Sequence, residues 1–231
     1  MAHRLLVLQE MAYGRHLGED QPSSPRTPTS ALEARSFKPS AGVVDSQSVK
    51  TSGVGGEDRG YDGGKKIKGR KRHLLVDTEG FVLKVKVHSA KVMDHEGIKA
   101  LLRKADERFS RLSHLWLDAG YRGEDKGKDW VEKTLGWSAE LVERPKKPAP
   151  ERVLMAWARE WATEGVKADW KKLMPPEGFL ILPRRWVVER TFSWIDQQRR
   201  MSKDYERLCA SGEAFVYAAM IRLMTRRLAR T

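Results

Sequence analysis

Two aspartates follow short apolar segments of the sequence. Asp45 comes directly after Val43 and Val44, and Asp118 comes after the segment 115–117 (LWL). A carboxylate at the end of a buried strand is costly without a partner, and ligands of mixed sheets bind at the carboxyl ends of strands. Because carboxylate oxygens are the ligands that Mg²⁺ and Mn²⁺ prefer, this pair indicates a metal site.

A third carboxylate would complete a site for two metal ions, which is the arrangement used in phosphodiester chemistry. The candidate is Glu189, in the segment RRWVVERTFSW. Its long side chain, carried by a helix, can extend to the end of a sheet. By helical spacing Glu189 shares a face with Phe192, which we expect to pack inward. The alternative is that these acids are ordinary solvated side chains, because the chain contains 31 Asp and Glu.

Hydrophobic patterning predicts the elements that position these acids. Alternating or continuous apolar runs predict strands, and i, i+3, i+4 spacing predicts helices. We expect strands at 43–45, 73–77, 81–88, 115–118 and 139–142. We expect helices from Asp94 through Phe109 and over 130–135, 151–164, 184–200 and 212–229. This order predicts an α/β fold, a mixed sheet flanked by helices.

The domain organisation follows from composition. Residues 1–42 contain the stretch DQPSSPRTPTS, which is typical of a linker, so we expect a poorly ordered arm there. Residues 43–231 form the predicted folded domain. Within it, the proline-rich PKKPAP and a later Pro-Pro pair mark 145–178 as a helical insertion before the helix that carries Glu189.

Composition excludes several classes of protein. The single cysteine, Cys209, excludes an intramolecular disulfide framework and a cysteine-clustered zinc site, and it suits a reducing cytoplasm. The sequence contains no apolar run of about 18 residues, so we expect no membrane span. In 231 residues, 44 Lys and Arg against 31 Asp and Glu leave a net charge of +13. Such an excess points to a polyanionic partner, most often nucleic acid.

The positive charge is concentrated in two segments. Residues 59–72 hold seven basic residues and one acid, and residues 184–231 hold 11 basic residues and five acids, so each segment is net +6. We expect the first to be a flexible loop that contacts phosphates. The candidate DNA contacts in these segments are Lys65, Lys66, Lys68, Arg70, Lys71, Arg72, Arg185, Arg190, Arg199, Arg200 and Lys203. The alternative for such residues is surface charge.

Two further candidates follow the second aspartate. Tyr121 and Arg122 come directly after Asp118-Ala119-Gly120, so they are placed to touch DNA near the metal ligands. The alternative for Tyr121 is that it closes the turn. Trp194 is a candidate for base stacking, but core packing is the more common role of such a tryptophan.

Four segments together resemble a known family. In chain order they are VVDSQSVK, KGRKRHLLVDTEGFVLKVKVHSA, LWLDAGYRG and LPRRWVVERTFSWIDQQRRMSKDYE. They resemble the DDE transposases of bacterial insertion sequences, in the IS-five branch of the IS-four/IS-five clan. The family pattern Asp-x-Gly-Tyr corresponds to Asp118–Tyr121, and Arg-x₃-Glu corresponds to Arg185–Glu189. The resemblance covers about residues 41–230.

This resemblance implies an RNase H-like fold in which Asp45, Asp118 and Glu189 hold two Mg²⁺ or Mn²⁺ ions. It implies hydrolytic nicking at the ends of an insertion sequence, followed by attack of the freed 3′-hydroxyl on target DNA. The partners would be double-stranded DNA, with terminal inverted repeats and target sites, and a second copy in a homodimer. It implies a bacterial cytoplasmic location at the nucleoid.

Relatives also carry an N-terminal helical DNA-binding region, often encoded in an overlapping upstream frame. Here only about 40 linker-like residues precede Asp45, so we expect this region to be missing or to be supplied as a separate upstream-frame product. Two alternative functions stay open on the sequence. One is a metal-dependent nuclease on the same fold, and the other is a non-catalytic DNA-binding remnant or regulator.

Overall fold

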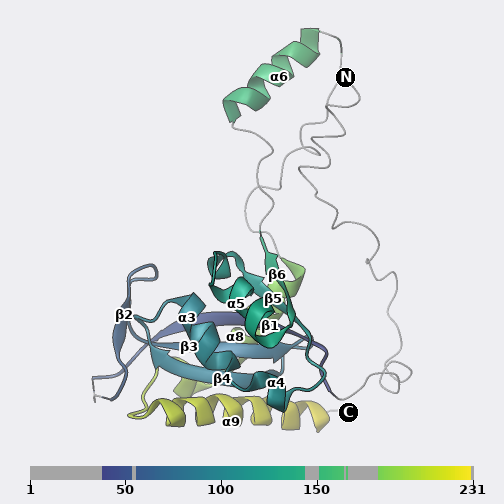
Figure 1. Cartoon of the computed structure of the whole chain (residues 1–231). Coiled ribbons are helices and arrows are strands. Elements are labelled where there is room, and N and C mark those ends of the chain that lie inside the picture. Colours follow the sequence, from purple (N-terminus) through teal and green to yellow (C-terminus); the bar gives the residue numbers. More distant parts are fainter. Residues whose placement is uncertain (1–37, 54–55, 144–150, 164, 166–181, 230–231) are drawn as a thin grey trace. The chain divides into compact units, whose positions relative to one another are not determined.

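The structure is a computed structural model that describes residues 38–53, 56–143, 151–163, 165 and 182–229 (Figure 1). Within these residues six strands form one sheet. The strands are β1 (Ala41–Lys50), β2 (Gly60–Asp62), β3 (Ile67–Asp77), β4 (Val82–Ser89), β5 (His114–Asp118) and β6 (Ser138–Val142). The helices are α3 (Asp94–Leu102), α4 (Ala105–Arg108), α5 (Gly127–Leu135), α6 (Glu151–Thr163), α8 (Pro183–Asp196) and α9 (Cys209–Leu228), with 3₁₀ turns at Ala119–Tyr121 and Arg199–Met201.

The sheet combines antiparallel and parallel pairing. Its strand order is β2-β3-β1-β5-β6. The short β2 pairs with residues 67–69 of β3, and β4 pairs with the following residues, 70–76. β3 runs antiparallel to β1, whereas β5 lies parallel to β1 and β6 lies parallel to β5. An antiparallel hairpin region joined to parallel strands, with helices on both faces, is the RNase H-like arrangement, so the predicted fold class is confirmed.

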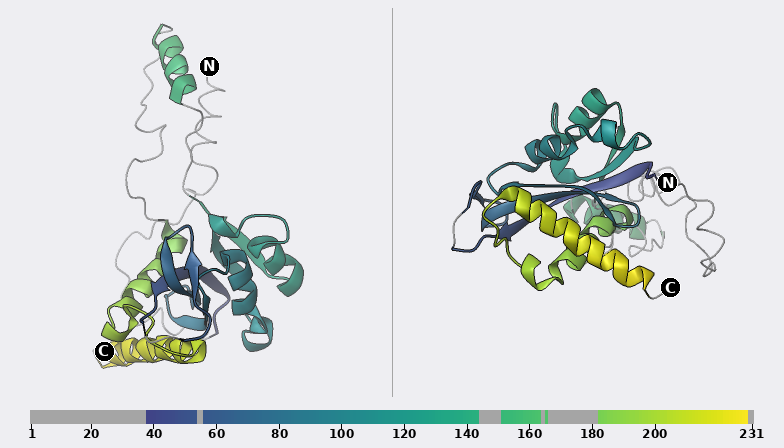
Figure 2. Two further views of the ribbon diagram at one scale, coloured as in Figure 1. Left: turned by 90° about the vertical axis from the view of Figure 1, so that its left-hand side faces the viewer. Right: turned by 90° about the horizontal axis from the view of Figure 1, so that it is seen from below.

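Alternation along the central strands divides the core between two faces. Val44, Leu75 and Leu117 are buried in one cluster with the apolar residues of α3 and α5. Val43 and Leu74, one residue away in sequence, are buried in a second cluster with α8 and α9. Successive strand residues point to opposite faces, and Figure 2 shows the two helix pairs on either side of the sheet. The sheet is therefore covered on both sides, and α8 lies on a different face from α3.

The first basic segment belongs to this sheet. The prediction of a flexible loop over 59–72 is wrong, because β2 covers Gly60–Asp62 and β3 begins at Ile67. β3 pairs with β1 from Gly69 to Asp77. The helices pack closely against it: a side chain at Gly97 of α3 would overlap the ring of His73 on β3. The segment thus forms a hairpin of the sheet, and its last residues, 69–72, are buried.

One outer strand is protected by side chains of the last helix. β4 pairs only with β3 among the described strands, so alternate backbone N–H groups point away from the sheet. Glu213 Oε1 accepts from Val87 N at 3.0 Å, and the Tyr217 hydroxyl accepts from Val85 N at 3.3 Å. Unpaired strand edges invite pairing with other chains. These two α9 side chains close part of that edge.

Two of the predicted helices are shorter than expected, whereas α5 and α9 begin three residues earlier than predicted. The predicted helix from Asp94 to Phe109 is interrupted, since α3 ends at Leu102 and Lys104 adopts a left-handed conformation (φ 59°) before α4. The helix predicted over 184–200 ends at Asp196, and a separate 3₁₀ turn follows. Both interruptions fall at exposed polar residues, Arg103 and Lys104 in the first case and Asp196 and Gln197 in the second.

The chain divides into two units. One comprises Ser36–Glu143 and Ile181–Thr231, and the other contains α6, the helix within the predicted insertion 145–178. Most of the predicted arm 1–42, and the insertion apart from α6 and residue 165, lie outside the described residues. Across the described part of the chain, no helix combines the length and the apolar character that a membrane crossing requires.

Candidate active site

The register of the parallel strands sets the two aspartates side by side. Val44 of β1 pairs with Leu117 of β5, and Asp45 and Asp118 are the next residues on each strand. β5 ends at Asp118 as predicted, but β1 continues to Lys50 along β3, so the prediction that Asp45 ends its strand is wrong. The two carboxylates therefore lie where neighbouring strands part, which is the usual location of ligands in such sheets. Each is partly exposed.

Arg185 joins the acid on β5 to the acid on α8. Its Nη1 donates to Asp118 Oδ1 at 3.0 Å, and its Nε lies 3.0 Å from Glu189 Oε1, one helical turn away. The second contact is an ion pair without hydrogen-bond alignment, since Nε has no hydrogen-bond partner. Positions i and i+4 share a helix face. The Arg-x₃-Glu spacing thus brings both side chains to the end of β5.

Asp45 belongs to the same electrostatic group. Burial raises the pKa of its carboxyl to about 6, and the charge of Asp118 adds to the rise. The Ser46 backbone N–H, which donates to Asp45 Oδ1 at 2.7 Å, and the charges of Arg185 and Lys65 act in the opposite direction. Asp45, Asp118 and Arg185 are therefore close enough to interact. An acid with a raised pKa beside other titratable groups is typical of functional sites.

The chemistry of this group suits a divalent cation. Within the ranges that the structure describes, no three His, Cys, Asp or Glu side chains gather closely enough to hold a metal ion by themselves. Instead Asp118 and Glu189 share one cation, the Arg185 guanidinium. The donors are carboxylate oxygens, the ligands of Mg²⁺ and Mn²⁺, and Asp45 is a carboxylate that positive charge nearby would keep ionised. The residues fit the ion that the sequence suggests.

Tyr121 lies inside the fold, not at the surface. Its side chain is 1% exposed, so the predicted contact with DNA is not available to it, and the alternative of closing the turn agrees with its position in the 3₁₀ turn after Asp118. Burial, together with the charges of Asp45, Asp94 and Asp118, raises the pKa of the phenol well above its usual value. Tyr121 is thus a buried, neutral phenol close to the acids of the site.

Three cations of the first basic segment are also buried. Arg70, Lys71 and Arg72 are at most 5% exposed. Arg70 donates to the carbonyls of Glu57, Glu206 and Arg207 and to Asp204. The prediction that these three lie on a DNA-contacting loop is wrong, because their charged groups are occupied by protein acceptors on opposite faces of β3.

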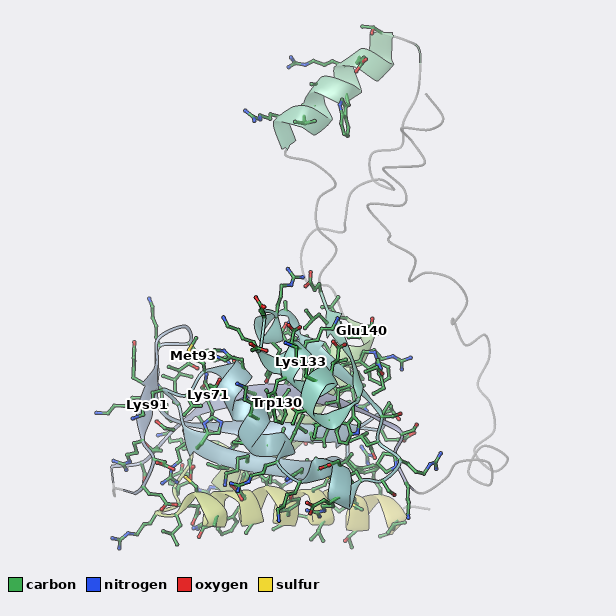
Figure 3. The ribbon with its side chains drawn as sticks, viewed as in Figure 1. Lys71, Lys91, Met93, Trp130, Lys133 and Glu140 are labelled. Carbon is green, nitrogen blue, oxygen red and sulfur yellow. The ribbon has the colours of Figure 1, made fainter. Side chains whose placement is uncertain are left out.

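Lys71 and Arg72 show the two faces. Lys71 Nζ donates to Asp94 Oδ1 at 3.0 Å on the face that carries α3, where it is labelled in Figure 3. Arg72 Nη1 donates to the Met201 carbonyl at 2.9 Å on the face that carries α8. The acids that accompany the buried cations are Asp62, Asp94 and Asp204; the sequence pattern placed Asp94 at the start of a helix but assigned none of the three to a buried cation. Asp62 lies within the predicted loop and Asp204 lies between two predicted helices, so no local pattern pointed to either.

The other predicted DNA contacts lie at the surface. The exposed cations are Lys65, Lys66, Lys68, Arg199, Arg200 and Lys203. Arg200 pairs with Glu206 at 2.9 Å, and Arg122, beyond Tyr121, pairs with Glu143. Arg190 donates to the Glu79 carbonyl at 2.8 Å. Arg190 and Arg227 both lie over the ring of Trp194, at 4.6 and 4.3 Å, which supports packing rather than base stacking for that ring.

Comparison with known proteins agrees with this architecture. No curated protein sequence matched the chain. The family model described as "Transposase DDE domain" matches residues 36–224, which include all six strands, α8 and most of α9. Members of this family are transposases or nucleases that act on DNA, and they typically use divalent metal ions. Since the match spans most of the chain and contains the three acids, the chain belongs to the transposase DDE domain family.

Proposed function

We propose that this chain is a DDE transposase catalytic domain that nicks DNA at the ends of an insertion sequence and joins the freed 3′-hydroxyl to target DNA. The main supporting observation is that Asp45 and Asp118 lie side by side on adjacent parallel strands, and that Arg185 links Asp118 to Glu189 on α8. Membership of the family supports the reaction class.

In this proposal Asp45, Asp118 and Glu189 hold Mg²⁺ or Mn²⁺, with two ions as the expected number. When bound, such ions would supply an activated water and would stabilise the attacking and leaving oxygens of an in-line displacement. The chain contributes the carboxylates and their placement. The positive charge of Arg185 offsets part of their negative charge, and Tyr121 packs close to them as a buried, uncharged side chain.

The proposed DNA surface consists of exposed and half-buried cations. The exposed ones are Lys65, Lys66 and Lys68 around the β2–β3 turn, Arg199, Arg200 and Lys203 after α8, and Arg122; the half-buried ones are Arg185 and Arg190 on α8. Phosphate contacts position a protein on DNA and make its affinity depend on salt. Arg70, Lys71 and Arg72 are left out, because their charged groups contact protein acceptors. A homodimer and an upstream-frame product are further partners in this proposal.

The test begins with the genomic DNA beside the reading frame, which identifies terminal inverted repeats for a labelled substrate. With Mg²⁺ or Mn²⁺, the wild-type chain should nick this duplex and join its 3′ end to a target plasmid. Asp118→Asn keeps the size of the side chain but should abolish both steps. Asp106→Asn, at an exposed position of α4, is the matched control and should retain them.

The products decide between the functions. Nicking without joined products would indicate a nuclease on the same fold. Salt-dependent DNA binding that survives Asp118→Asn, with no cleavage in either metal, would indicate a non-catalytic DNA-binding module. Cleavage that Asp118→Asn leaves intact would overturn the assignment of the site.

A further inference from the structure

A short turn between β2 and β3 is fixed beside the acids by one carboxylate. Asp62 Oδ1 accepts from the backbone N–H groups of both Gly64 and Lys65, each at 3.0 Å. Its other oxygen, Oδ2, accepts from Ser48 Oγ at 2.6 Å, and Ser48 belongs to β1. The turn is therefore tied through Asp62 to the strand that carries Asp45.

The surroundings of Asp62 keep its side chain ionised. Its side chain is 9% exposed and lies 3.5 Å from Lys71 Nζ, which also contacts Asp94. Burial alone raises the pKa of Asp62. The Ser48 hydrogen bond, the Lys65 N–H and the charges of Lys71 and Lys65 outweigh burial and bring the pKa to about 2. The anchor is thus charged at every pH at which the protein would act.

The anchored turn directs one lysine to the first catalytic acid. Lys65 Nζ donates to the Ser46 carbonyl at 3.1 Å, and the Ser46 N–H donates to Asp45 Oδ1 at 2.7 Å. The Lys65 charge is among those that lower the pKa of Asp45. The lysine is nevertheless exposed, and its acceptor is a neutral carbonyl. Of the exposed lysines in this segment, Lys65 is the one whose ammonium group the structure joins to the residue next to Asp45.

We propose that Lys65 binds the reacting DNA phosphate at the acid site and that Asp62 is the positioning residue that holds it there. The inference rests on the proposed function. A phosphate oxygen is a stronger partner for an ammonium group than a neutral carbonyl is, because both groups are charged. Arg185, on α8, reaches the acids from a different element. A phosphate beside Asp45 would therefore contact cations from both the β2–β3 turn and α8.

The first experiment measures nicking of the terminal-repeat duplex in Mn²⁺, at limiting and at saturating DNA. Lys65→Ala should lower the rate at saturating DNA by about 100-fold, the usual effect of removing one donor to a charged transition state. Lys65→Arg should recover at least a tenth of the wild-type rate, since it restores a cation. Lys91→Ala is the control: Lys91 is exposed at the same end of the sheet, against β2, and is labelled in Figure 3. It should behave as wild type.

The second experiment is a double-mutant cycle that separates positioning from folding. Asp62→Ala should slow nicking, and combining it with Lys65→Ala should add little further loss, because both changes remove the same contact. Asp62→Asn, which keeps an oxygen acceptor for the two N–H groups, should retain more activity than Asp62→Ala. Thermal unfolding of each variant shows whether it is folded at the assay temperature.

The outcomes distinguish this inference from the proposed function. If the wild type nicks and Asp118→Asn does not, yet Lys65→Ala behaves like Lys91→Ala, the function holds and the Lys65 inference is overturned. Additive losses in the cycle would overturn the role of Asp62. A wild-type chain that cleaves no DNA would overturn the proposed function together with this inference.

Discussion

Replacing Asp45 by asparagine should stabilise the metal-free protein while removing its activity. The change keeps the shape of the side chain and an oxygen that can accept from the Ser46 N–H. It removes a negative charge that the fold disfavours, because burial and the charge of Asp118 raise the pKa of Asp45 from 3.8 to about 6. In the wild type, ionised Asp45 therefore lowers the free energy of unfolding, and the variant does not have this loss.

The magnitude and its pH dependence follow from this pKa. Each pKa unit corresponds to about 1.4 kcal/mol, so ionised Asp45 costs at most about 3 kcal/mol. The side chain is partly exposed, so we expect about 1–3 kcal/mol. A raised carboxyl pKa stabilises the fold only while the group is protonated. The wild type should therefore lose stability relative to Asp45→Asn as the pH rises from about 4 to about 6, and the difference should stay constant above that.

The assay is urea unfolding in EDTA at pH 4 and pH 8. At pH 8 Asp45→Asn should be the more stable protein, and at pH 4 the two should agree. Asp125→Asn, at an exposed acid paired with Lys133, should match the wild type at pH 8. Added Mg²⁺ should stabilise the wild type and not Asp45→Asn, since a ligand stabilises only a state that binds it. Equal stability at pH 8, or the same gain at both pH values, would refute this reasoning.

Three further predictions concern other contacts. Arg185→Gln should lower the rate of nicking by at least about 100-fold, because it removes a fixed cation beside Asp118 that would stabilise a charged transition state. A rate within threefold of wild type would contradict this. Arg70→Met should cost about 3–5 kcal/mol in urea unfolding, because it leaves Asp204 buried without its partner, and Asp204→Leu added to it should recover part of the loss. Glu213→Ala should cost about 1–2 kcal/mol and increase light scattering on mild heating, because it frees an edge N–H of β4; unchanged scattering would argue against edge protection.

The acid site was the part of the molecule most accessible from sequence. Asp45 and Asp118 end apolar runs, and strand ends of a mixed sheet meet at one place, so patterning alone predicted that they would be neighbours. The sequence also offered Glu189 as the third acid, and the Arg-x₃-Glu family pattern included Arg185. What spacing could not show is that Arg185 links Glu189 to Asp118, because that contact depends on how α8 packs on the sheet.

The buried cations were not predictable from local pattern. A run of seven basic residues with glycines is typical of a solvated loop, and the acceptors that make burial possible come from elsewhere in the chain. Arg70 is matched by Asp204 and by carbonyls of the segment before α9, and Lys71 is matched by Asp94 on α3. Buried charge is tolerated only with such partners. For Tyr121 the sequence left two roles open, because the turn pattern does not say which way its ring points; its burial agrees with closing the turn.

The separation of the three acids along the chain has a consequence for synthesis. Asp45 and Asp118 become neighbours when β5 joins β1, but Glu189 reaches them only after α8 has left the ribosome and docked on the sheet. Contacts between distant segments form late, because a long loop must be closed first. A growing or truncated chain that ends before α8 therefore lacks the complete set of acids. The order of folding itself delays any DNA-cutting activity until the protein is nearly finished.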